Sequence, residues 1–207
     1  MTQELESADF RTSLLSRGRC FVYVWPCAYE DILKLGFSRD PLGRLQALHR
    51  RFYEFFDLTR ALLIETETVR DARRLELLLA GDIELHNAPA PLVVRREAGG
   101  HTEWYRGAFD ILEQAAAALA ATGYVVHCPA LPLLRSGLVT QSERLFAWSS
   151  QTLLAMESGA CPADIVEDLG QTLRDALDAY AVFDIELEPL LPPAVWRWYS
   201  VTGRRAR

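Results

Sequence analysis

The sequence predicts an α+β fold: a small three-stranded antiparallel sheet flanked by helices, followed by a mainly α-helical C-terminal region. Two runs of strand-forming residues lie close together near the N-terminus, and a third lies between two helical segments. Helix-type spacing of apolar residues dominates the second half. The 207 residues are 50% hydrophobic and 24% charged, which is typical of a globular chain and excludes a disordered one.

The first two strands are expected at CFVYVW (20–25) and LKLGFS (33–38). The first run is rich in β-branched and aromatic residues, and the second alternates apolar and polar residues after a turn-like CAYED segment. RALLIETE (60–67) is expected to form the third strand. Strands joined by a short turn pair antiparallel, so these runs predict an antiparallel sheet.

Helices are expected on either side of the third strand. Asp40 and Pro41 form a helix-start signal, and leucines at helical spacing follow at 42, 45 and 48. Residues 68–85 carry the longest helical pattern of the first half. Prolines then interrupt the chain, so residues 91–100 are expected to form a brief strand and a turn. A helix over 105–122, ended by Gly123, completes this half.

We divide the chain into an N-terminal extension (1–19), a domain (20–124) and a helical region (125–207). Residues 125–135 resemble a proline-punctuated linker, helices are expected at 140–157 and 162–183, and 187–200 form an aromatic, proline-rich tail. The acidic helix 162–183 carries an apolar stripe that either forms an intrachain core or docks another chain. The stripe consists of Ile165, Leu169, Leu173, Leu177 and Tyr180.

Charge and cysteine usage limit the possible partners. The net charge of −6 excludes an overall basic field that would hold nucleic acid or an anionic membrane. Residues 32–53 are the local exception, with five basic side chains against Asp40 alone. Four scattered cysteines, an acidic N-terminus and no long apolar run predict a soluble, cytoplasmic protein that does not associate with membranes.

A set of polar residues recurs at defined spacing in the first half. It comprises Tyr23 in FVYVW, Lys34 and Gly36 in LKLGFS, Arg44, Glu76 in RRLE, and the EWY triplet that contains Glu103 and Trp104. The set resembles the GIY-YIG nuclease superfamily, in particular the phage-type DNA-binding branch with a Lys-x-Gly second half-motif and a late Glu-Trp-aromatic triplet. The resemblance covers residues 20–122. The sequence departs from the pattern at Phe21 and Val22, which replace Gly-Ile, and at Lys34, which replaces the second tyrosine.

The resemblance implies a DNA endonuclease that depends on one divalent ion, Mg²⁺ or Mn²⁺. Tyr23 would act as base or water-orienter, Lys34 and Arg44 as electrostatic stabilisers, and Glu76 as the metal ligand. These residue types suit the chemistry, because a guanidinium matches phosphate geometry and a carboxylate suits a hard cation. Tyrosine, with an ordinary pKa near about 10, serves as a base only if a nearby cation lowers that value.

Further residues of the same region have expected roles. Glu103 is interpreted as a carboxylate at the start of a helix, and Trp104 as a side chain packed on the sheet. Four further basic side chains are expected to contact DNA phosphates. They are Arg39, His49, Arg50 and Arg51.

Two other functions fit the same residues. A DNA-binding module of the same fold would need only the basic patch, without catalysis. A protein-interaction role, including self-association, would use residues 125–207. The tail residues Trp196, Trp198 and Tyr199 either stack bases or close the helical core. A zinc site built from His86, His101, His127 and Cys128 is not expected, since the spacing of these residues fits no zinc arrangement.

Overall fold

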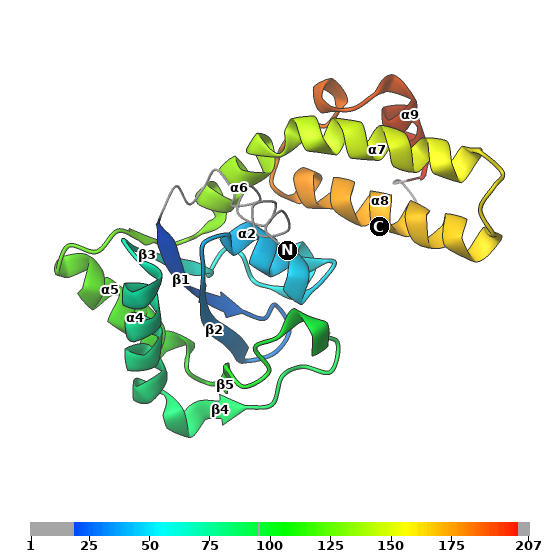
Figure 1. The fold of residues 1–207 in the computed structure, drawn as a ribbon. Coiled ribbons are helices and arrows are strands. Elements are labelled where there is room, and N and C mark those ends of the chain that lie inside the picture. Colours follow the sequence, from blue (N-terminus) through cyan, green and yellow to red (C-terminus); the bar gives the residue numbers. More distant parts are fainter. Residues whose placement is uncertain (1–18, 95, 203–207) are drawn as a thin grey trace, which may run out of the picture. The chain divides into compact units, whose positions relative to one another are not determined.

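The computed structural model describes residues 19–94 and 96–202, so the predicted N-terminal extension lies outside the described residues except for Arg19. The chain divides into two compact units, one ending at Gly137 and the other beginning at Leu138. Figure 1 shows the strands gathered in the first unit and only helices in the second. No helix among the described residues is long and apolar enough to cross a membrane.

The sheet of the first unit is antiparallel and has six strands, in the order β4-β5-β2-β1-β3-β6, among the described residues. The prediction of a three-stranded sheet was therefore wrong, although the three expected strands form its centre. The three added strands are only two or three residues long, too short to show alternation in the sequence. The strands are β1 (Cys20–Pro26), β2 (Ile32–Ser38), β3 (Leu62–Thr66), β4 (Asn87–Ala88), β5 (Trp104–Arg106) and β6 (Val126–His127).

Two segments of this unit differ from the prediction. The strand expected within 91–100 is wrong, because the described residues of this segment form turns and a short 3-10 helix. The last helix begins after residue 105, since residues 104–106 pair with β2. The helices are α2 (Pro41–Leu48), α3 (Phe52–Phe55), α4 (Val69–Asp82), η2 (Glu84–His86), η3 (Arg96–Ala98) and α5 (Phe109–Ala121).

The two faces of the sheet are covered differently. Alternate residues of the central strands, such as Val22, Val24 and Leu35, pack with α4 and α5 into one apolar core. Figure 1 shows α4 and α2 on opposite sides of the strands. The other alternate set, which contains Tyr23 and Lys34, is also buried but faces away from α4. This second face carries Tyr23 and Lys34, and Arg44 of α2 meets Tyr23 there.

The first unit extends further along the chain than residue 124. Val126 and His127 pair with Ile64 and Leu63 of β3. The Ala130 amide donates a hydrogen bond to the carbonyl of Ala61, the residue before β3. The segment predicted as a proline-punctuated linker continues into the helix α6 (Leu131–Thr140). Pro132 lies in the first turn of α6, where its missing N–H costs no hydrogen bond.

The second unit is helical, as predicted. It contains α7 (Ser142–Glu157), α8 (Ala163–Val182), η4 (Glu188–Leu190) and α9 (Pro193–Thr202). The apolar stripe of α8 mostly faces the interior, since Leu173, Leu177 and Tyr180 are buried. The aromatic tail packs on α8: Arg174 lies 5.6 Å from the Trp198 ring centroid, and the Tyr199 hydroxyl donates to Asp178 at 2.6 Å. The tail thus closes the helical core.

Candidate functional site

Tyr23 lies directly across from Gly36 in the β1–β2 pair. Its ring crosses the neighbouring strand, because a Cβ atom at position 36 would lie 2.4 Å from the Tyr23 hydroxyl oxygen. Glycine is therefore required for the tyrosine to reach past β2. The glycine of the Lys-x-Gly motif has a physical role here, which is to make room for the hydroxyl.

Arg44 meets Tyr23 from helix α2. Pro41 occupies the first turn, and the Asp40 side chain caps the helix by accepting from the Gly43 amide at 2.9 Å. Arg44 follows in the next position, and its Nε donates to the Tyr23 hydroxyl at 3.2 Å. Two residues that the sequence singled out separately are thus in contact.

The Tyr23 hydroxyl is held in its neutral form. Burial raises the pKa of Tyr23, and this effect outweighs the opposing influence of the Arg44 guanidinium. A role as general base, which requires a lowered pKa, is not supported by this environment. The hydroxyl accepts from Arg44 and retains its own proton for donation to another oxygen.

Lys34 is fully buried and has an acidic partner. Its Nζ donates to Glu103 Oε2 at 2.6 Å and to the Glu103 backbone carbonyl at 3.3 Å, and it lies 5.7 Å from the Trp104 ring centroid. Burial lowers the pKa of Lys34, while the hydrogen bond to Glu103 acts in the opposite direction. The ammonium group thus points at Glu103, and Glu103, 42% exposed, is the member of the pair that reaches solvent.

The interpretation of Glu103 as a carboxylate at a helix start was wrong. Helix α5 begins at Phe109, and Glu103 instead precedes strand β5. The strand pairing of Lys34 with Trp104 places the carboxylate beside the lysine. Trp104 packs on the sheet as expected, is fully buried, and stacks with Phe56 at a centroid distance of 6.4 Å.

Glu76 lies on α4 and is half-buried. Burial raises the pKa of Glu76, and the Glu103 carboxylate raises it further, while Lys34 and Arg73 act in the opposite direction. Glu76 therefore lies within electrostatic range of the Lys34–Glu103 pair. Tyr23, Lys34, Arg44, Glu76 and Glu103 thus form one electrostatically connected set, which we call the charged cluster.

The donor chemistry of the charged cluster fits a hard divalent cation. Glu76 and Glu103 repel one another, and a cation near both carboxylates would relieve that repulsion. Mg²⁺ is commonly held by one or two carboxylates and keeps several waters. In the part of the chain that the structure describes, no group of three or more His, Cys, Asp or Glu side chains suits a metal ion. A site here would thus depend on Glu76, Glu103 and water.

The four additional basic residues are not equally available. Arg39 is exposed, whereas the other three are half-buried. His49 stacks on Phe55 at a centroid distance of 4.5 Å and accepts through Nδ1 from the Arg51 amide. The Arg51 guanidinium pairs with Glu54 at 2.5 Å. Fewer of these side chains are therefore available to contact phosphate than the sequence predicts.

The sequence did not reveal a backbone segment that covers the cluster. Arg44 donates through Nη2 to the Gly99 carbonyl at 3.2 Å and through Nη1 to the Ala98 carbonyl. The Gly100 carbonyl accepts from Trp104 Nε1 at 3.1 Å. We call residues 98–100 the strap. The adjacent glycines were the available signal, because both take positive φ angles that favour glycine.

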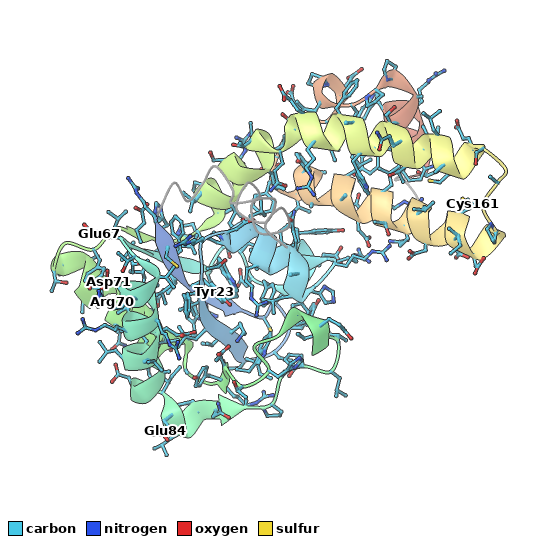
Figure 2. The ribbon with its side chains drawn as sticks, in the orientation of Figure 1. Tyr23, Glu67, Arg70, Asp71, Glu84 and Cys161 are labelled. Carbon is cyan, nitrogen blue, oxygen red and sulfur yellow. The ribbon has the colours of Figure 1, made fainter. Side chains whose placement is uncertain are left out.

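A separate surface hollow of about 560 Å³ lies elsewhere in the first unit, and Arg19, Glu65 and Asp71 are among the residues that line it. None of the predicted site residues lines this hollow. Figure 2 shows Asp71 at the start of α4, away from Tyr23 on the sheet. The charged cluster and the hollow are therefore different places.

Comparison of the chain with protein-family models, curated proteins and solved structures found no match. The function is accordingly argued from the residues of the charged cluster.

Proposed function

We propose that this chain is a metal-dependent DNA endonuclease of the GIY-YIG type, which hydrolyses phosphodiester bonds. One observation carries the proposal: the hydroxyl of Tyr23 on β1 and the guanidinium of Arg44 on α2 meet at 3.2 Å, over Gly36 of the Lys-x-Gly motif. Phosphodiester cleavage needs a cation that binds phosphate oxygens and a group that orients the attacking water. These two side chains supply both.

Each member of the charged cluster has a proposed role. Arg44 binds the phosphate through its planar fork and stabilises the charge that develops on it. Tyr23 donates its retained proton to orient the water or a phosphate oxygen. Glu76 holds Mg²⁺ or Mn²⁺ with Glu103 nearby. When bound, such an ion lowers the pKa of a coordinated water and polarises a phosphate oxygen.

Lys34 acts through Glu103 in this proposal. Its ammonium group is fully buried and donates to Glu103, so it adds positive charge beneath the cluster without reaching a phosphate directly. Lys34 replaces the second tyrosine of the superfamily pattern. It thereby fixes the position of a second carboxylate within electrostatic range of Glu76.

The proposal is tested by nicking of supercoiled plasmid with added Mg²⁺ or Mn²⁺, comparing the wild type with Glu76→Ala. Glu113→Ala is the matched control, because Glu113 is an exposed helical glutamate on α5 outside the cluster. Nicking by the wild type and by Glu113→Ala, with loss in Glu76→Ala, is expected. Equal nicking by all three proteins would refute the assigned role of Glu76.

A DNA-binding module without cleavage is the second candidate. The observation that favours it is the environment of Tyr23, because burial raises the pKa of this tyrosine and a general base would need a lowered one. Such a module would retain DNA on a gel, lose it as salt is added, and cleave nothing. Salt-sensitive binding without nicking in either metal would therefore favour this candidate over the enzyme.

A further inference from the structure

The strap lies where the positive side chains of the charged cluster converge. A Cβ atom built on Gly100 would lie 2.8 Å from Arg44 Nη2, 3.0 Å from Lys34 Nζ and 3.0 Å from Glu103 Oε2. Gly100 therefore fills the space between these three charged groups. A residue with a side chain does not fit there unless one of them moves.

The carbonyl oxygens of the strap take the hydrogen bonds that a phosphate would take. Arg44 uses Nε for Tyr23 and its two Nη atoms for the strap, at the Ala98 and Gly99 carbonyls. Guanidinium groups bind phosphate through paired donors of this kind. A phosphate that reaches the Nη atoms must therefore displace the strap.

We propose that the strap is an autoinhibitory element, which occupies the phosphate position of Arg44 and is displaced by a phosphodiester of the bound nucleic acid. The inference rests on the proposed function and adds regulation to the same site. The Arg44 guanidinium is the charged donor in both cases, but a phosphate also carries the opposite charge and accepts two parallel hydrogen bonds from the planar guanidinium, so it is a stronger partner than neutral carbonyl groups.

Two features of the strap favour opening and closing. Gly99 and Gly100 have φ angles of +67° and +68°, which glycine adopts without strain. The last residue of the strap is held by a hydrogen bond from Trp104 Nε1 to the Gly100 carbonyl. Each of these features can be changed without altering Tyr23, Arg44 or Glu76.

The experiment measures the affinity of the full chain for a short fluorescein-labelled DNA duplex, by anisotropy, without divalent metal and at fixed salt. Trp104→Phe removes the hydrogen bond to Gly100, and Gly99→Ala strains the closed strap, since its Cβ meets nothing within 4 Å but its φ is unfavourable. Gly159→Ala is the matched control, with φ +69° and nothing within 4 Å, in the second unit.

Loosening the strap is expected to tighten DNA binding. Apparent affinity rises with the fraction of molecules that are open, so Gly99→Ala should bind about 5-fold more tightly than the wild type. Trp104→Phe should gain roughly 2- to 10-fold, the range for loss of one hydrogen bond. Gly159→Ala should bind as the wild type does. Melting curves and circular dichroism identify any variant that fails to fold. If Trp104→Phe fails to fold, the binding of Gly99→Ala alone tests the proposal.

The outcomes separate the strap from the proposed function. Unchanged or weaker DNA binding by folded Gly99→Ala and Trp104→Phe would overturn the proposal that the strap is autoinhibitory, even if the wild type nicks plasmid. Tighter DNA binding by these variants without any nicking would support the autoinhibitory role of the strap and would refute the proposed endonuclease activity. An absence of DNA binding in every variant would overturn both, because an open strap exposes Arg44 to phosphate.

Discussion

Replacing Glu103 with glutamine should destabilise the first unit by about 2–3 kcal/mol, because it leaves the buried Lys34 ammonium without its charged partner. Removing one member of a fully buried ion pair costs about 3–5 kcal/mol. Lys34 is 0% exposed, but the Glu103 side chain is 42% exposed, so water compensates part of the loss. Glutamine keeps a carbonyl oxygen that accepts a hydrogen bond from Lys34, which also reduces the expected loss of stability below that range.

A double-mutant cycle isolates this interaction. Lys34→Met removes the buried charge and fills its volume, and should cost only about 1 kcal/mol, because a buried pair is often replaceable by apolar groups. Adding Glu103→Gln to Lys34→Met should then cost little more, which gives a coupling energy of about 2 kcal/mol. Urea titration of the full chain measures the free energy of unfolding.

The pH dependence of unfolding supplies a second check. The pKa of Lys34 is already lowered from 10.5, and loss of Glu103 lowers it further. Between its folded pKa and 10.5 the unfolded chain binds more protons, so stability rises with pH through that window. The deficit of Glu103→Gln should therefore shrink as pH rises through that window towards 10.5. A deficit under about 0.5 kcal/mol, or strict additivity in the cycle, would refute the reasoning.

Two further predictions follow from the geometry of the charged cluster. Gly36→Ala should cost about 1–3 kcal/mol by overpacking and should abolish nicking, because the new Cβ displaces the Tyr23 hydroxyl. Gly81→Ala on α4, which meets nothing within 4 Å, should instead stabilise the fold by about 1 kcal/mol in the same urea titration; destabilisation of similar size in both variants would contradict this explanation. The rate of nicking should fall as pH drops through the raised pKa of Glu76. Glu103→Gln should move this acid limb of the pH profile to lower pH, because it removes one cause of the raised pKa. An acid limb that stays in place would show that Glu103 does not influence Glu76.

The central strands and long helices are predictable from local pattern. A run of β-branched and aromatic residues is enough to identify β1, and alternation is enough for β2. Helical spacing over 14 or more residues is enough for α4, α7 and α8. The two- and three-residue strands carry no such pattern, since tertiary pairing alone makes them extended. The helix α6 was missed because its proline reads as a break, although it lies in the first turn.

The candidate site was predictable in its residues more than in its contacts. Tyr23 and Arg44 were expected at one site, and they lie in contact. The Lys34–Glu103 pair was not foreseen, because it depends on strand β5, and the sequence analysis placed Tyr105 and Arg106 of that strand in a helix. The strap was missed because Gly99 and Gly100 indicate a turn but do not indicate which side chain the carbonyl groups of that turn contact.

The central claim is that Tyr23, Arg44 and Glu76 act together on one phosphodiester. Single-turnover rates of plasmid nicking for Tyr23→Phe, Glu76→Ala and the combined variant test it most directly. Residues that act as a unit give strongly non-additive losses, so the combined variant should be no slower than the slower single variant. Losses that multiply in the combined variant, or single variants that nick at the wild-type rate, would contradict the claim.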